Sequence, residues 1–159
     1  MSLVTPWPKF RQAIVRALRA NLVLEDQLAG GWNEGSAPQP TAERPTVWPH
    51  GVYSLAYGPP EYDWTGVVNI VGADVVVFSK DSGDAASIDQ LVFDTLQDAK
   101  LSVTGLTTLS CRRVGIISLT YTDAEGKKVF VLGGTYQARL AQSTPHQGSL
   151  SITIDSTIS

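Results

Sequence analysis

The chain has 159 residues, the length of one domain, and its 43% hydrophobic and 17% charged residues describe a globular protein with few charges. A net charge of −3 argues against a protein that grips nucleic acid, because that needs clustered Lys and Arg. The single cysteine, Cys111, excludes an internal disulfide and a cysteine zinc cluster, and a buried core thiol is favoured over a reactive one.

The N-terminal sequence "MSLVTPWPKF" lacks the apolar stretch of a signal peptide. The longest apolar run, Val75 to Phe78, is far too short to cross a bilayer. We therefore expect a soluble protein without membrane contact, kept in a reducing compartment.

The first periodic segment predicts an amphipathic helix. Its apolar residues recur at the 4, 3, 1 and 4 spacing of one helix face, starting at Phe10 and ending at Leu22. Pro8 suits a first helical turn, and Gly30 and Gly31 end the segment. Residues 24–28 either continue this helix or form a second short turn.

Residues 30–49, rich in Gly, Pro and small polar residues, predict a long loop. Trp32 and Trp48 lie within it. Each either anchors the loop to its own domain or docks on a partner, since aromatic residues favour interface centres.

Two strands, one helix and a hairpin follow. Alternation predicts a strand from residue 52 to 57, and dense β-branched residues predict a central strand over 65–79, covered by a helix on at least one side. A second amphipathic helix is predicted over about 84–99, capped by Ser82 or Asp84, with Asp89 on its polar face. Residues 113–121 and 129–141 predict a hairpin around "TDAEGKK", and Gly133-Gly134 predicts a bulge or a close backbone approach.

The last residues, 142–159, read as an extended arm. Leu150, Ile152 and Ile154 alternate with polar residues after a breaker cluster, which predicts a short strand that pairs with its own sheet or with a neighbour's sheet edge. The whole order predicts an α+β domain over 1–141, mainly an antiparallel sheet packed with two helices, followed by the arm.

The sequence contains no pattern that predicts catalysis or cofactor binding. It lacks HExxH, CxxC, phosphate-loop and nucleophile-elbow motifs, and both of its histidines follow prolines. The stretch "SKDSGDAAS" follows a strand as many nucleotide loops do, but Lys80 precedes its single Gly, and Asp81 and Asp84 would repel phosphate. We therefore expect a turn, no metal, no cofactor and no enzymatic activity, although a ligand-binding use of residues 79–85 stays an alternative.

Several of these segments together resemble a known family. The N-terminal helix with "LRANLVLEDQLAG", the strand ending in Phe78-Ser79, its small polar loop and following helix, and a hairpin with an Asp-x-x-Gly turn at 123–126 are similar to the tail-completion (tail-terminator) proteins of long-tailed bacteriophages. The resemblance covers roughly residues 9–141. The long loop 30–49 and the arm depart from the family pattern.

The resemblance implies a structural virion protein at the head–tail interface, assembled in the host cytoplasm. Family members form hexameric rings that end tail-tube polymerisation and present a surface to the head connector, while DNA passes through the lumen. The expected partners are therefore further copies of the chain, the tail-tube protein and a head-completion protein. Another connector or tube subunit is the alternative. The candidate interface residues are Trp32, Trp48, Leu150, Ile152 and Ile154.

Overall fold

The computed structural model describes residues 6–36, 41, 43, 45–57, 68–101 and 105–142. The described chain is an α+β domain, as predicted. Its elements, in order, are α1 (Pro6–Ala20), α2 (Leu22–Gln27), β1 (Trp32–Glu34), β2 (His50–Tyr57), β3 (Val68–Ser79), α3 (Ser82–Leu96), β4 (Leu106–Thr122) and β5 (Lys128–Gln142).

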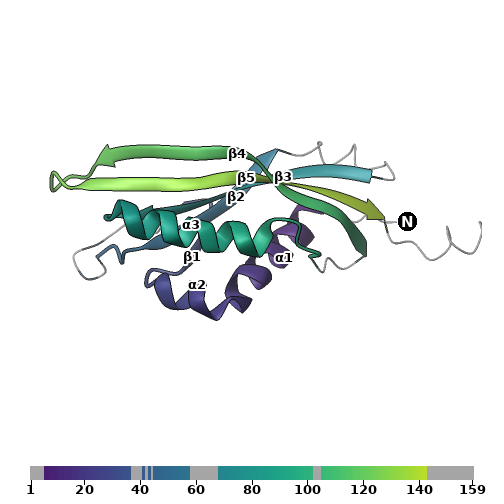
Figure 1. Ribbon diagram of the computed structural model, residues 1–159, viewed down its shortest axis with the longest axis horizontal. Helices are drawn as coiled ribbons and strands as arrows, with labels where there is room; N and C mark the ends of the chain where they lie inside the picture. Colours follow the sequence, from purple (N-terminus) through teal and green to yellow (C-terminus); the bar gives the residue numbers. More distant parts are fainter. Residues whose placement is uncertain are drawn as a thin grey trace, which may run out of the picture.

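All five strands form one sheet in the order β1-β2-β3-β5-β4. Only the short β1 runs parallel to its neighbour, and every other pair is antiparallel. Figure 1 shows the three helices on one side of this sheet and none on the other. The strands therefore have one helix-covered face and one helix-free face.

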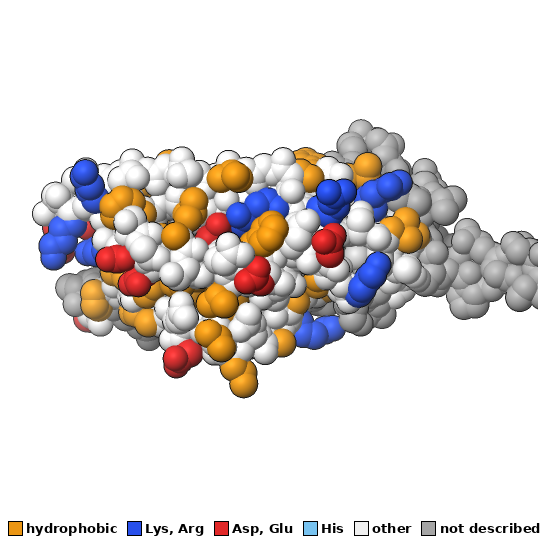
Figure 2. Space-filling view, viewed as in Figure 1, with side chains coloured by type: hydrophobic (Ala, Val, Ile, Leu, Met, Phe, Trp, Pro, Cys, Tyr) orange, Lys and Arg blue, Asp and Glu red, His pale blue; other side chains and the backbone are white. Residues whose placement is uncertain are grey.

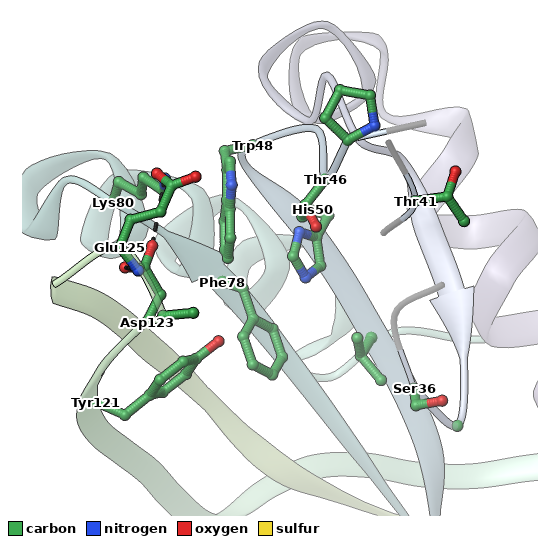
Figure 3. Close-up of a pocket in the computed structure, with 14 residues that line it drawn as sticks. Ser36, Thr41, Thr46, Trp48, His50, Phe78, Lys80, Tyr121, Asp123 and Glu125 are labelled. Atoms are coloured by element: carbon green, nitrogen blue, oxygen red, sulfur yellow. Dashed lines mark hydrogen bonds and ion pairs between the residues drawn. The ribbon is translucent and has the colours of Figure 1, made fainter. Parts of the chain in front are cut away.

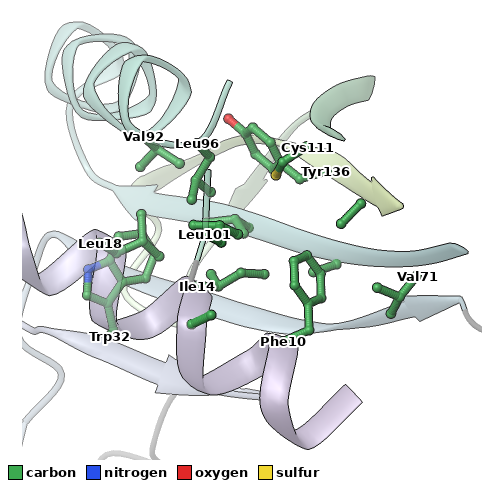
Figure 4. Close-up of a cluster of buried hydrophobic side chains, with 14 of the residues drawn as sticks. Phe10, Ile14, Leu18, Trp32, Val71, Val92, Leu96, Leu101, Cys111 and Tyr136 are labelled. Atoms are coloured by element: carbon green, nitrogen blue, oxygen red, sulfur yellow. The ribbon is translucent and has the colours of Figure 1, made fainter. Parts of the chain in front are cut away.

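β3 is the central strand, as its sequence predicts. Val71, Ala73, Val75 and Val77 are fully buried on the face that the helices cover. Figure 4 shows the core that they join, with Phe10, Ile14 and Leu18 of α1 opposite Val92 and Leu96 of α3. The alternation of β-branched residues thus gives a strand whose covered face holds the centre of the core.

The N-terminal helical segment divides in two. Asn21 interrupts it, accepts a hydrogen bond from the Leu24 backbone N–H at 3.1 Å and caps α2. The second short turn that the sequence left open is therefore a separate helix. The Asn21 amide also donates to the Thr95 hydroxyl of α3 at 3.0 Å, which ties the corner between α1 and α2 to the core.

α3 begins slightly earlier than the sequence predicts, and its cap is neither Ser82 nor Asp84. The Asp81 carboxylate accepts a hydrogen bond from the Asp84 backbone N–H at 2.8 Å, while the Asp81 N–H donates to the Ser79 hydroxyl at 3.1 Å. The residue just outside the helix is the one with extended backbone, so it alone can turn its side chain back to the first turn.

The predicted loop 30–49 contains a strand, which corrects the sequence-based reading. β1 pairs in parallel with β2, with Trp32 opposite Gly51. A Cβ on Gly51 would lie 2.3 Å from two atoms of the Trp32 ring, so only glycine leaves room for this indole. Three residues are too few to show the alternation from which a strand is recognised.

The predicted hairpin is present, and its strands are longer than expected. Asp123 accepts hydrogen bonds from the backbone N–H groups of Glu125 and Lys127, and Gly126 adopts a φ of 81°, so both predicted turn residues close it. At Gly133 an added Cβ would lie 2.1 Å from the Val75 carbonyl oxygen, which confirms a close backbone approach. The register of β3 against β5 stays continuous there.

The division into a domain over 1–141 and an arm stays a prediction, because residues 143–159 lie outside the described ranges. Within the described ranges, no helix has the length and apolar character needed to cross a membrane.

Candidate assembly surfaces

The helix-free face of the sheet exposes polar and apolar side chains together. Asp74 of β3 pairs with Thr135 of β5, whose hydroxyl donates to the carboxylate at 2.5 Å. The Tyr57 phenol of β2 reaches over Gly72 of β3 and donates to the side-chain oxygen of Gln137 of β5 at 2.6 Å. Ile70 is about half exposed between them and the strand's start. Such a face can be exposed to water, because it carries polar groups, and its apolar side chains still offer contact area to a partner.

The outer edge of β4 carries the second candidate surface. β4 ends the strand order, so among the described strands it pairs only with β5 and leaves its outer row of backbone N–H and C=O groups without a strand. Several large apolar residues of β4 are exposed, and Ile116, at 75%, is the most exposed of them. Those residues are Leu109, Val114, Ile116, Leu119 and Tyr121. Register shifts after Thr108 and after Arg113 interrupt the pairing.

A hollow of about 840 Å³ lies between the β4–β5 turn and the loop that leads into β2. Figure 3 shows a stack of aromatic rings along it, from Trp48 through His50 to Phe78. The rings of Trp48 and His50 are 4.8 Å apart, and those of His50 and Phe78 are 5.0 Å apart and nearly parallel. The ammonium group of Lys80 lies 5.3 Å from the centre of the Trp48 ring.

Three polar side chains at this hollow, His50, Lys80 and Asp123, have partners within the domain. Burial lowers the pKa of His50 below its ordinary value, so the ring stays neutral near pH 7, and one ring nitrogen meets the Val47 carbonyl oxygen at 3.3 Å. Hydrogen bonds from the Lys127 and Glu125 backbone N–H groups lower the pKa of Asp123, whose carboxylate lies 3.5 Å from Lys80. Lys80 thus links the hairpin turn, through Asp123, to the segment that enters β2, through Trp48.

A buried ion pair joins α3 to β4. The Arg113 guanidinium forms a two-pronged pair with the Asp89 carboxylate, donates to the Tyr136 hydroxyl at 2.7 Å and lies against the rings of Phe93 and Tyr136. Burial raises the pKa of the Tyr136 phenol, which stays protonated. Asp89 therefore faces the sheet and not solvent, contrary to the sequence prediction, because Arg113 compensates its charge.

Cys111 is fully buried in the core, as predicted. Burial, followed by the nearby negative charge of Asp98, raises the pKa of its thiol to about 12, which suppresses the reactive thiolate.

The two candidate tryptophans have different positions. Trp32 is only 7% exposed and belongs to the core cluster, which is the intramolecular packing that the sequence left open as one alternative. Trp48 is half-buried and lines the hollow. Its role in an interface stays a prediction. Leu150, Ile152 and Ile154 lie outside the described residues, so their roles stay predictions too.

The described part of the chain contains no group of three or more His, Cys, Asp or Glu side chains placed to hold a metal ion. The Ser79–Asp81 turn uses its hydroxyl and carboxylate on its own backbone N–H groups. The structural role of this strand-to-helix turn is therefore to start α3.

Sequence reasoning missed the main polar cluster, the network of Arg113, Asp89 and Tyr136, because the sequence contains no signal for it. Its members lie on three separate elements.

The fold defines a small α+β domain with helices on one face of an antiparallel sheet and with open edge and face surfaces. No protein-family profile matches the sequence, and no curated protein matches it either. Among solved structures, a chain in the virion of the native gene transfer agent (GTA) particle has a similar fold, with a TM-score of 0.61 at 14% sequence identity. The match covers 87% of this chain and 99% of the virion chain.

Proposed function

We propose that this chain is a structural subunit of a phage-like virion, and more specifically a tail terminator that forms a ring at the head-proximal end of the tail. The observation that carries the proposal is the fold similarity to a virion chain, which spans almost the whole of that chain. The similarity of residues 9–141 to the tail-completion family supports the finer assignment. The proposed role is one of assembly and not of catalysis.

The open edge of β4 supports a ring. A protomer with a free strand edge can pair head to tail with the next copy, and a closed ring leaves no edge unpaired. β4 offers that edge over a length of seventeen residues, from Leu106 to Thr122. Six copies, the tail-tube protein below and a connector protein above are the proposed partners, and DNA passes through the lumen without specific contacts.

The arm is proposed to strengthen the ring. Leu150, Ile152 and Ile154 alternate with polar residues, the pattern of a strand with one apolar face. The exposed edge of β4 carries apolar side chains at alternate positions, including Leu119 and Tyr121. An arm strand added to the β4 edge of a neighbouring copy would place its apolar side chains next to these apolar side chains of β4.

The test is assembly. Light scattering after size-exclusion chromatography should give a ring-sized oligomer, and negative-stain images of mixtures with tail tubes should show rings at one end of each tube. A chain truncated after Gln142 keeps β5 and should stay folded while it assembles more weakly. The terminator role is contradicted if the full chain stays monomeric, or if tubes grow to unlimited length in its presence.

A different connector or tube subunit is the second candidate, because a long exposed strand edge suits any ring-forming virion protein. Rings that stack along a tube, and do not stay at its end, would favour a tube subunit.

A further inference from the structure

The charges of the helices are separated by element. Every charged residue of α1 is basic, namely Lys9, Arg11, Arg16 and Arg19. Every charged residue from 81 to 98, the segment that holds α3, is an aspartate. The two longer helical segments of this weakly charged chain thus carry charges of opposite sign.

The basic patch borders a groove of about 680 Å³ beside α1. Its far wall is formed by Glu34 of β1 and Tyr53 of β2, and its apolar lining comes from Val15, Ala20 and Tyr53. Arg11 is already engaged, since its guanidinium lies 2.8 Å from the Glu34 carboxylate. Arg16 and Arg19 are exposed, and within the described residues they form no ion pair. The groove therefore offers two unengaged guanidinium groups above apolar surface.

The acidic patch consists of exposed aspartates on α3 and just beyond its C-terminal end. Asp89 is engaged by Arg113, and Asp81 caps the helix, which leaves Asp84, Asp94 and Asp98 exposed. Figure 2 shows carboxylates along the side of the molecule where α3 lies. Among the described residues, the hydrogen-bond partner of the Asp94 carboxylate is the side-chain amide of Gln90 on its own helix, at 2.8 Å.

The two patches lie toward opposite ends of the strand order. The groove is bounded by β1 and β2, at one end of the sheet, whereas α3 packs on β3, β5 and β4, toward the other end, and contacts α1 and α2 with its remaining inner side. One chain therefore carries a basic surface on one flank and an acidic surface on the other, the arrangement of a head-to-tail contact between identical copies.

We propose that the α1 groove receives the acidic outer side of α3 from a second copy of this chain. Arg16 and Arg19 would pair with Asp94 and Asp98 of that copy, and the apolar lining would exclude water from the contact. This contact rests on the proposed ring and names the lateral surfaces that join its subunits. Nucleic acid fits the groove less well, because Glu34 occupies its wall and only two cations are unengaged.

The test reverses both charges of the groove and, on the acidic side, reverses one charge and removes the other. Variant A carries Arg16→Glu and Arg19→Glu, and variant B carries Asp94→Arg and Asp98→Asn. Asparagine is chosen at 98 because Asp98 has a φ of 58°, which asparagine tolerates. Each variant should raise the protein concentration at which half of the chains are assembled by about tenfold or more, because variant A places like charges together at two positions, and variant B places them together at one and removes the other ion pair.

The combination of A and B should restore assembly to within about threefold of the wild type, since the glutamates of variant A then face the arginine introduced at position 94 and no like charges meet. The matched control is Glu25→Arg with Asp26→Arg, which reverses two exposed acids on α2 and should leave assembly unchanged. Circular dichroism confirms that each variant is folded. Raising the salt concentration to about 1 M should weaken wild-type assembly, because screening then acts within about 3 Å.

The outcomes separate this contact from the ring itself. If the wild type forms rings and variants A and B form them equally well, this inference is wrong while the proposed function stands. If the combination of A and B fails to restore assembly although it is folded, the two patches do not meet. If variant A assembles normally but loses affinity for duplex DNA, the groove serves nucleic acid and the inference is overturned. A wild-type chain that stays monomeric contradicts both proposals.

Discussion

The two faces of the sheet have similar strand residues and different environments. On β3, Val75 and Val77 are fully buried on the helix-covered face, whereas Val76 and Phe78, their neighbours in sequence, are only partly buried on the other. All four are apolar. The difference is created by α1 and α3, which pack on one face only (Figure 1). Residue type alone therefore does not determine which side of this strand is core.

This difference separates stability from assembly. The helix-covered face contains the continuous core cluster and the Arg113–Asp89 pair. The helix-free face and the β4 edge contain exposed apolar groups beside small polar groups. Substitutions on the first face should change the free energy of unfolding, and substitutions on the second should act mainly on association with other chains.

The largest expected effect compares two phenylalanines on opposite faces. Phe10→Ala removes a fully buried ring between α1 and the sheet and should lower the free energy of unfolding by about 3–5 kcal/mol. Phe78→Ala removes a half-buried ring that stacks on His50 and should lower it by only about 1 kcal/mol. Urea unfolding of both variants measures the two values. Equal losses would show that the helix-free face is as important to stability as the core.

The next effect concerns the buried ion pair. Asp89→Ala leaves the Arg113 guanidinium without its carboxylate and should lower the free energy of unfolding by about 3 kcal/mol. Asp94→Ala, on the exposed side of the same helix, should change it by less than about 0.5 kcal/mol.

A double variant identifies the cause of that loss. Asp89→Leu combined with Arg113→Met removes both charges and should recover most of the stability, since no unpaired charge then stays buried. If the double variant is as unstable as Asp89→Ala, the loss comes from packing and not from charge.

The smallest effect is a pH dependence at the hollow. Burial lowers the pKa of His50 in the folded chain below its ordinary 6.5, so the unfolded chain binds a proton more readily. The contribution of the neutral His50 ring to the free energy of unfolding is therefore complete above pH 6.5, and it is lost as the pH falls through 6.5 toward the pKa of His50 in the folded chain. His50→Phe keeps a ring in the stack and removes the titrating group. The urea midpoint should then fall less between pH 7 and pH 5 than it does for the wild type.

Some elements could be predicted because their signal is local. β3 and α3 have clear periodicity, and the turn at Asp123 and Gly126 has residues that define turn geometry. β1 could not be predicted, because a three-residue strand has no periodicity and depends on pairing with β2. The burial of Asp89 could not be predicted either, since Arg113 lies 24 residues further along the chain.

Only some features of the candidate interface could be predicted from the sequence. The sequence identified Trp32 and Trp48 as equivalent loop aromatics, but β1 carries Trp32 into the core, whereas Trp48 lines the hollow. The opposite charges of α1 and α3 are visible in the sequence. That they lie on opposite flanks follows only from the strand order.

The sequence alone determined the α+β class, the helical and strand periodicities, the buried cysteine and the hairpin turn, because neighbouring residues carry those signals. Only the tertiary structure decided which face of β3 is core, which aspartate is buried and which strand edge is open. Each of these depends on residues that are distant in sequence and meet only when the helices pack on one side of the sheet.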